Sequence, residues 1–186
     1  MMLPGRQAVF TAQQASHAAY DAAVHAVVQH MITSRRKAAV LELADRYLGD
    51  IPEVMVDVLR PPTAERHVVM SAERQRHVIE RRTIADELDA ELVAFRLTEA
   101  LANVRYQLLP QRDPRIFEVI SYVPSVDRCL VLPLKLVSAV DAGTKKDEWW
   151  LQTAFPIGAK KFRRAKAKNR LVELQAGPLP SDWAFR

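Results

Sequence analysis

The apolar residues of this 186-residue chain change their spacing along its length, and that change constrains the fold more than any other feature. From residue 11 to about residue 31, an alanine-rich stretch repeats apolar residues at helical spacing. Beyond Pro114 the apolar residues fall in short runs rich in β-branched and aromatic side chains, which are typical of strands. We therefore expect an α+β fold in which N-terminal helices are followed by a helix-plus-antiparallel-sheet domain.

The double proline Pro61-Pro62 is the strongest internal break in the chain, because proline cannot continue a helix and keeps the residue before it extended. Besides the helix expected over 11–31, two more are expected before it, over residues 34–48 with Gly49 as the stop, and from Pro52 onward. This break predicts three parts: a helical N-terminal region for interaction or oligomerisation (1–60), an α+β domain (63–175) and a C-terminal tail (176–186).

The α+β domain is expected to begin with an extended run and two helices. The run is His67–Met70, and Ser71 then caps a helix that continues to Arg82. A longer helix is expected over 84–108, followed by strands over 116–123, 129–140 and 149–155 in one antiparallel sheet. Because Pro133 has no N–H to donate, it predicts an edge position, a bulge or a break in its strand.

Charge is concentrated near the C-terminal end. The chain has 27 Lys and Arg against 22 Asp and Glu, and residues 1–60 are neutral, so the excess lies beyond them. No acid interrupts the stretch from Lys160 to Arg170. Such a cluster favours a polyanion such as nucleic acid, and the alternative is a solvated basic surface. The candidate nucleic-acid-binding residues are Lys160, Lys161, Arg163, Arg164, Lys166 and Lys168.

Several function classes lack their usual sequence evidence. The single cysteine, Cys129, excludes an internal disulfide and a cysteine-based zinc site within one chain, and we expect it to be buried. No apolar run reaches the roughly 18 residues that cross a bilayer, and no secretory signal is recognised. We expect a cytoplasmic protein with no membrane partner. Glycine-rich phosphate loops, nucleophile elbows, paired-histidine metal motifs and dinucleotide fingerprints are absent from the sequence, so no cofactor or metal is predicted.

A histidine framed by arginines is the clearest candidate for chemistry. Arg74, His77 and Arg81 lie at i, i+3 and i+7 of the helix expected after Ser71, and therefore share one face. An imidazole can exchange a proton near neutral pH, and guanidinium groups bind phosphate oxygens, so this face suits a phosphodiester. The alternative is a surface helix in which His77 packs against the sheet.

Two segments, in this order, resemble a known family. Residues 67–82 read HVVMSAERQRHVIERR, and residues 149–156 read WWLQTAFP before a basic stretch. They resemble the phage-associated nuclease-like domains grouped with barnase, EndoU, the tRNA-cleaving colicins and RelE. In that group an Arg-x-x-His-[Ile/Val] helix precedes a sheet whose last strand ends in Thr-Ala-[Phe/Tyr]. The resemblance covers residues 66–170.

This resemblance implies RNA cleavage without a metal, in a toxin or effector encoded by a phage or mobile element. His77 would be the acid or base, Thr153 would hydrogen-bond the scissile phosphate, and Arg74 or Arg81 would bind its charge. Members often carry a second histidine a turn later, where this chain has Arg81-Arg82-Thr83. The second proton-transfer group is then Lys135, Lys160 or none.

A non-catalytic role is the alternative. The chain would then bind nucleic acid or assemble a phage or other complex, with residues 1–60 as the module that binds a protein partner or inhibitor. Alternation along the last strand places Trp149, Leu151, Thr153 and Phe155 on one face. Trp150 points to the other face, where it could either pack or stack on a nucleobase.

Overall fold

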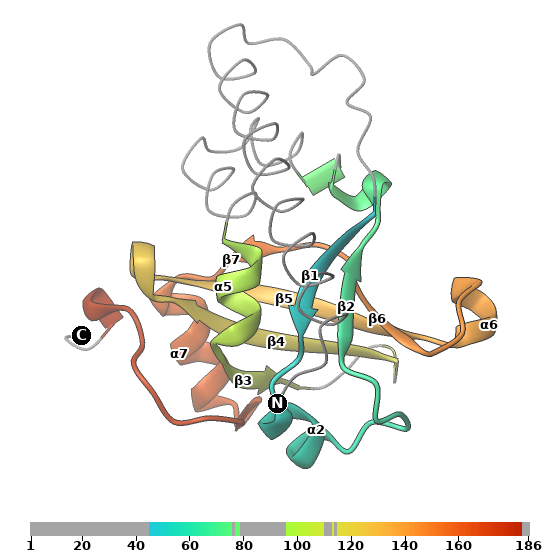
Figure 1. The fold of residues 1–186 in the computed structure, drawn as a ribbon. Helices are drawn as coiled ribbons and strands as arrows, with labels where there is room; N and C mark the ends of the chain where they lie inside the picture. The colour runs from blue at the N-terminus through green and yellow to red at the C-terminus, as the bar shows by residue number, and fades with distance from the viewer. Residues whose placement is uncertain (1–44, 76, 79–95, 110–112, 114, 184–186) are drawn as a thin grey trace, which may run out of the picture. The chain divides into compact units, whose positions relative to one another are not determined.

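The computed structural model describes residues 45–75, 77–78, 96–109, 113 and 115–183 (Figure 1). The chain divides into two units, 1–40 and 41–186, and every described residue belongs to the second. The predicted helix over 11–31 and most of the one over 34–48 lie outside the described residues. The described part is α+β, as the sequence predicts.

Strands dominate this part of the chain. They are β1 (Arg46–Asp50), β2 (His67–Met70), β3 (Val104–Leu108), β4 (Ile116–Val123), β5 (Arg128–Val137), β6 (Glu148–Leu151), β7 (Phe155–Pro156) and β8 (Leu171–Glu173). The helices are α2 (Glu53–Leu59), α5 (Leu97–Ala102), α6 (Ala139–Ala142) and α7 (Ala159–Ala167), with 3-10 turns η1 (Pro124–Val126) and η2 (Ser181–Trp183). Residues 72–75, 77 and 78 are also helical.

The strands form one sheet in the order β1-β2-β6-β5-β4-β3-β8, with β7 beside β5. The pair β2 and β6 is parallel, whereas the other described pairs are antiparallel. The predicted antiparallel pairing of the strands over 116–123, 129–140 and 149–155 is confirmed, whereas the sheet as a whole is mixed rather than antiparallel. The parallel pair arises because β2 and β6 are not joined by a hairpin: the described part of the intervening chain includes the helix after Ser71, α5, β3, β4, β5 and α6.

Strand β1 corrects the end of the predicted helix over 34–48, because Arg46–Asp50 is extended and pairs antiparallel with β2. Helix α2 follows with Pro52 as its N-cap residue, close to the predicted start. Leu48, Ile51 and Met55 are fully buried in the same core as β2. The break predicted at Pro61-Pro62 thus lies within this unit, in the connection between α2 and β2.

The long helix predicted over 84–108 also ends earlier than expected. Helix α5 stops at Ala102, and Val104–Leu108 is strand β3, which pairs with β4 on one side and β8 on the other. In contrast, the predicted strands His67–Met70 and Ile116–Val123 are confirmed with the same bounds.

The two sheet faces carry separate cores. On one face, side chains of β2, β5 and β6 pack against α5 and α2 around Trp149, whose ring meets Phe117 edge-on at 5.2 Å. On the other face, Ile120 and Val131 pack beneath Phe162 of α7. Helix α5 contacts β1, β4 and β5, and Figure 1 shows it beside β1, with α7 near β3 and β4. Leu179 and Trp183 join this second core, so the segment expected as a C-terminal tail packs on the sheet as far as it is described.

Pro133 explains why the strand predicted over 149–155 is split into β6 and β7. The Pro133 carbonyl accepts the Gln152 N–H at 3.0 Å, so the N–H that proline lacks would also point toward this neighbour. Between the pairs Leu134–Leu151 and Val131–Phe155, β5 has two residues and its neighbour has three. The extra residue reverses which side chains of the segment after β6 point to each face of the sheet, as in a β-bulge.

This reversal corrects the predicted face of the strand. Trp149, Leu151 and Ala154 belong to one core, whereas Phe155 packs against the other core. Thr153 lies within the interruption and is partly exposed. The prediction that Phe155 shares a face with Trp149 is wrong, because one unpaired residue shifts the register.

Candidate nucleic-acid interface

Helix α7 holds the predicted basic cluster on a fixed support. Gly158 is its N-cap residue, and Phe162 and Ala165 are its buried side chains. The Phe162 ring lies 5.2 Å from the Tyr106 ring and 4.8 Å from the Trp183 ring. One side of α7 is therefore anchored on the sheet, and the remainder of its circumference faces outward.

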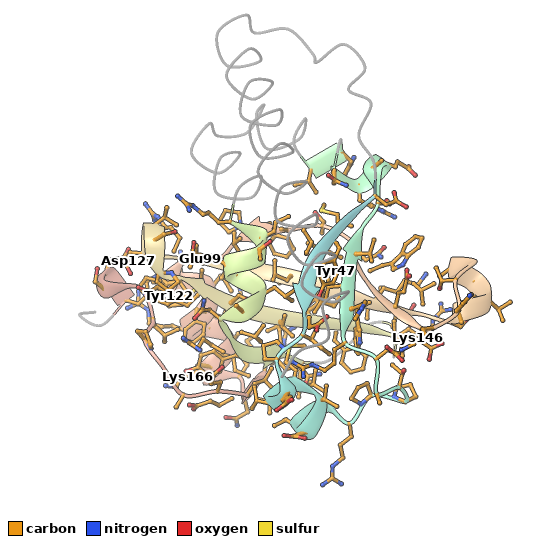
Figure 2. All side chains as sticks on the ribbon, in the orientation of Figure 1. Tyr47, Glu99, Tyr122, Asp127, Lys146 and Lys166 are labelled. Atoms are coloured by element: carbon orange, nitrogen blue, oxygen red, sulfur yellow. The ribbon has the colours of Figure 1, made fainter. Side chains whose placement is uncertain are left out.

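The outward side of α7 is cationic. Lys160, Lys161, Arg163, Arg164, Lys166 and Lys168 are all exposed, and Figure 2 labels Lys166 among them. Across the described ranges, no acidic side chain forms an ion pair with Lys160, Lys161, Arg164, Lys166 or Lys168. The Lys161 ammonium lies 5.0 Å from the centre of the Phe155 ring. The structure thus places five of the six predicted nucleic-acid-binding residues on α7 and the sixth, Lys168, at its C-cap position.

The helical stretch that carries His77 is also anchored on the core, and its candidate residues Arg74 and His77 face outward. Ser71 Oγ accepts the Arg74 backbone N–H at 3.3 Å, which confirms Ser71 as the cap. Gln75 is buried and donates from Nε2 to the Met70 carbonyl at 2.9 Å, and Val78 is buried in the core. Arg74 and His77 are exposed. The third member of the predicted face, Arg81, lies outside the described residues.

The parallel pair brings the second candidate segment to the same end of the sheet. Val68 pairs with Trp149 and Val69 with Trp150, so β2 and β6 run side by side and finish at one edge. The His77 helix begins directly after β2, and Thr153 lies two residues after β6. Among the described contacts, no hydrogen bond joins His77 to Thr153.

A part of the α7 side of the sheet is open to solvent in the described structure. Register partners share a face, and one row of partners crosses five strands: Tyr47, Val69, Trp150, Lys135 and Ile116. Each of the five is only partly buried. The adjacent row on the other face consists of Met70, Leu151, Leu134 and Phe117, all of which are buried.

Carboxylates hold the aromatic rings of this open part in place. The Tyr47 hydroxyl donates to Asp50 Oδ1 at 2.7 Å, and His67 Nδ1 lies 3.1 Å from the same oxygen. The Tyr47 and His67 rings are 5.4 Å apart. Burial, and next the hydrogen bond to Asp50, raise the pKa of Tyr47 well above its ordinary value, so its hydroxyl stays protonated.

Trp150 is held in the same way from the neighbouring strand. Its Nε1–H donates to Glu148 Oε2 at 2.9 Å. Sequence reasoning proposed Trp150 as a possible stacking residue but missed Tyr47, Asp50 and His67. Tyr47 was assigned to a helix and Asp50 to the connection after it, and only the pairing of β1 with β2 brings them beside His67. His67 begins β2, whereas His77 lies in the helical stretch that follows the end of β2, so the strand separates the two histidines.

Within the described ranges, no cluster of three or more His, Cys, Asp or Glu side chains is placed to hold a metal ion. No helix in those ranges has the length and apolar character to cross a bilayer. Comparisons of the chain with protein-family models, with curated proteins and with solved structures find no match.

Proposed function

We propose that this chain binds RNA and that the outward face of α7 contacts the phosphates. The observation that carries the proposal is the set of exposed cations on a helix that is anchored from behind by Phe162 and Ala165. Lysine and arginine side chains that meet phosphates release condensed counterions, which supplies most of the sequence-independent affinity for nucleic acid.

The position of two of these cations supports a binding role over a structural one. The first turn of α7 contains no acid, and Lys160 and Lys161 lie there. Partial positive charge at a helix N-terminus makes a cation unfavourable, typically by about 0.3–1 kcal/mol. Helix stability therefore does not account for Lys160 and Lys161, whereas a phosphate contact at the positive end of the helix does.

The test is equilibrium binding of a labelled single-stranded RNA to three proteins. These are the wild type, the double variant Lys160→Gln/Arg164→Gln and the control Arg128→Gln/Lys145→Gln, which removes the same charge from exposed positions outside α7. We expect weaker binding only in the α7 variant. Equal weakening in both variants, or no binding by the wild type, would contradict the proposal.

Metal-independent RNA cleavage is a second candidate, supported by the placement of His77 and Thr153 at one end of the sheet. In such a reaction a base takes the ribose 2′-hydroxyl proton and the 2′-oxygen attacks phosphorus. The bond from phosphorus to the 5′-oxygen breaks, and an acid protonates that oxygen. His77 is exposed and can transfer one of these protons, while Arg74 neutralises phosphate charge.

Cleavage is tested by incubating total RNA with the protein in EDTA and resolving the products on a denaturing gel. We expect products from the wild type and from Glu73→Ala, a control in the same exposed turn, but none from His77→Ala. Full activity of His77→Ala would remove His77 from the reaction. Intact RNA with all three proteins would leave RNA binding without cleavage.

A further inference from the structure

We propose that the open part of the sheet, the row Tyr47, Val69, Trp150, Lys135 and Ile116 together with the adjacent His67, stacks the bases of single-stranded RNA. This inference rests on the proposed RNA binding and names the class of RNA that is bound. Aromatic side chains on an accessible sheet stack unpaired bases without regard to their sequence, because every base has a π-face. A duplex offers no such faces, since its bases are already stacked on one another.

The rings are set in position before any ligand arrives. Asp50 accepts from Tyr47 and contacts His67, and Glu148 accepts from Trp150. Each carboxylate therefore restricts the rotation of a ring that remains partly accessible, which lowers the entropy lost when a base stacks on it. In a purely structural role these rings would instead be buried, as Trp149 is on the opposite face.

The open part and α7 lie on the same side of the sheet. Along β5, Cys129 and Val131 pack in the core beneath α7, and Lys135 projects from the same face farther along the strand. Val131 and Lys135 are four residues apart, or about 13 Å in a strand. Phe155 lies between the open part and α7: it follows the interruption after β6, and its ring contacts the Lys161 ammonium of α7.

The open part of the sheet and the outward face of α7 differ in charge, so we expect them to contact different parts of the RNA. Glu118, Glu148 and Asp50 make the open part acidic apart from Lys135 and His67, and acidic groups repel phosphates. Helix α7 has the opposite charge. The arrangement therefore fits a strand whose phosphates lie along α7 and whose bases turn toward Trp150, where the carboxylates can accept hydrogen bonds from base N–H groups.

The experiment compares a single-stranded oligouridine with a duplex RNA of the same length, both labelled, by fluorescence anisotropy. The proteins are wild type, Trp150→Ala, Trp150→Phe and the control Val140→Ala, which alters a side chain that is 90% exposed on α6. We expect the wild type to prefer the single strand. Trp150→Ala should weaken that binding about 5-fold or more without changing duplex binding, and Trp150→Phe should retain most of it because it keeps a ring.

The outcomes separate the two proposals. Equal binding of both RNAs by the wild type, or single-strand binding that is unchanged in Trp150→Ala, would overturn the stacking surface and leave the α7 contact standing. Equal loss of single-strand and duplex binding in Trp150→Ala and Trp150→Phe would also overturn it, because stacking acts on unpaired bases. A wild type that binds neither RNA would overturn both proposals.

Discussion

The salt dependence of RNA binding tests the role of α7 quantitatively. Lys160, Arg164 and Lys168 follow one another at intervals of four residues, so they form a row along one side of the helix. Each interval spans about 6 Å along the axis. A single strand can follow such a row, with one phosphate near each cation.

The perturbation is a graded series: Lys160→Gln, then Lys160→Gln/Arg164→Gln, then the triple variant with Lys168→Gln added. Glutamine has nearly the same helix propensity as lysine and arginine, so the series changes charge with little effect on α7 itself. For single strands the slope of log K against log salt concentration is about −0.7 for each phosphate that is neutralised. The slope should therefore become shallower by about 0.7 at each step, and by about 2 in the triple variant.

The assay is anisotropy of a labelled single-stranded RNA over a series of KCl concentrations, with circular dichroism to confirm the fold of each variant. The control Arg128→Gln/Lys145→Gln should keep the wild-type slope. A triple variant with the wild-type slope would refute the argument, because it would show that these cations release no counterions on binding.

Three further predictions concern the fold that supports these surfaces. Trp149→Phe removes a buried indole that donates to the Glu65 carbonyl at 2.8 Å, so it should lower the free energy of unfolding by about 2–4 kcal/mol in urea denaturation; an unchanged midpoint would contradict this packing. Hydrogen bonds from Ser181 lower the pKa of Asp127, so the stabilising contribution of Asp127 is full above the ordinary carboxyl pKa of about 4 and is lost as pH falls through the lowered value. Asp127→Asn should therefore reduce the fall in melting temperature at acid pH. The same fall in the variant and the wild type would show that this contact contributes nothing. Burial raises the pKa of Cys129 to about 12, so a thiol reagent at neutral pH should label it only after unfolding, and fast labelling of the folded protein would place it at the surface.

Local sequence patterns were sufficient to predict secondary structure where a short segment contains the residue types that favour its own conformation. His67–Met70 and Ile116–Val123 have the predicted bounds because their β-branched and aromatic residues are strand formers bordered by turn residues. The cap at Ser71 was predictable because a hydroxyl before a helical stretch satisfies a free backbone N–H. The basic cluster from Lys160 onward was also identifiable, since charged residues can be counted directly in the sequence.

Two short strands overlap the ends of predicted helices. Arg46–Asp50 and Val104–Leu108 have apolar residues that suit either a helix end or a strand. Their state depends on partners that are distant in the sequence: β2 for the first, and β4 and β8 for the second. Spacing within a segment contains no information about such partners.

By itself, the sequence determined the α+β class, the positions of several strands, the buried cysteine and the cations that α7 presents. Only the tertiary structure decided that β2 runs parallel to β6, and that Tyr47, His67 and Trp150 lie on one open part of the sheet. It also decided that one extra residue beside Pro133 separates Phe155 from the face of Trp149. The physical reason is that composition and alternation act within a segment, whereas register and strand order arise from hydrogen bonds between segments.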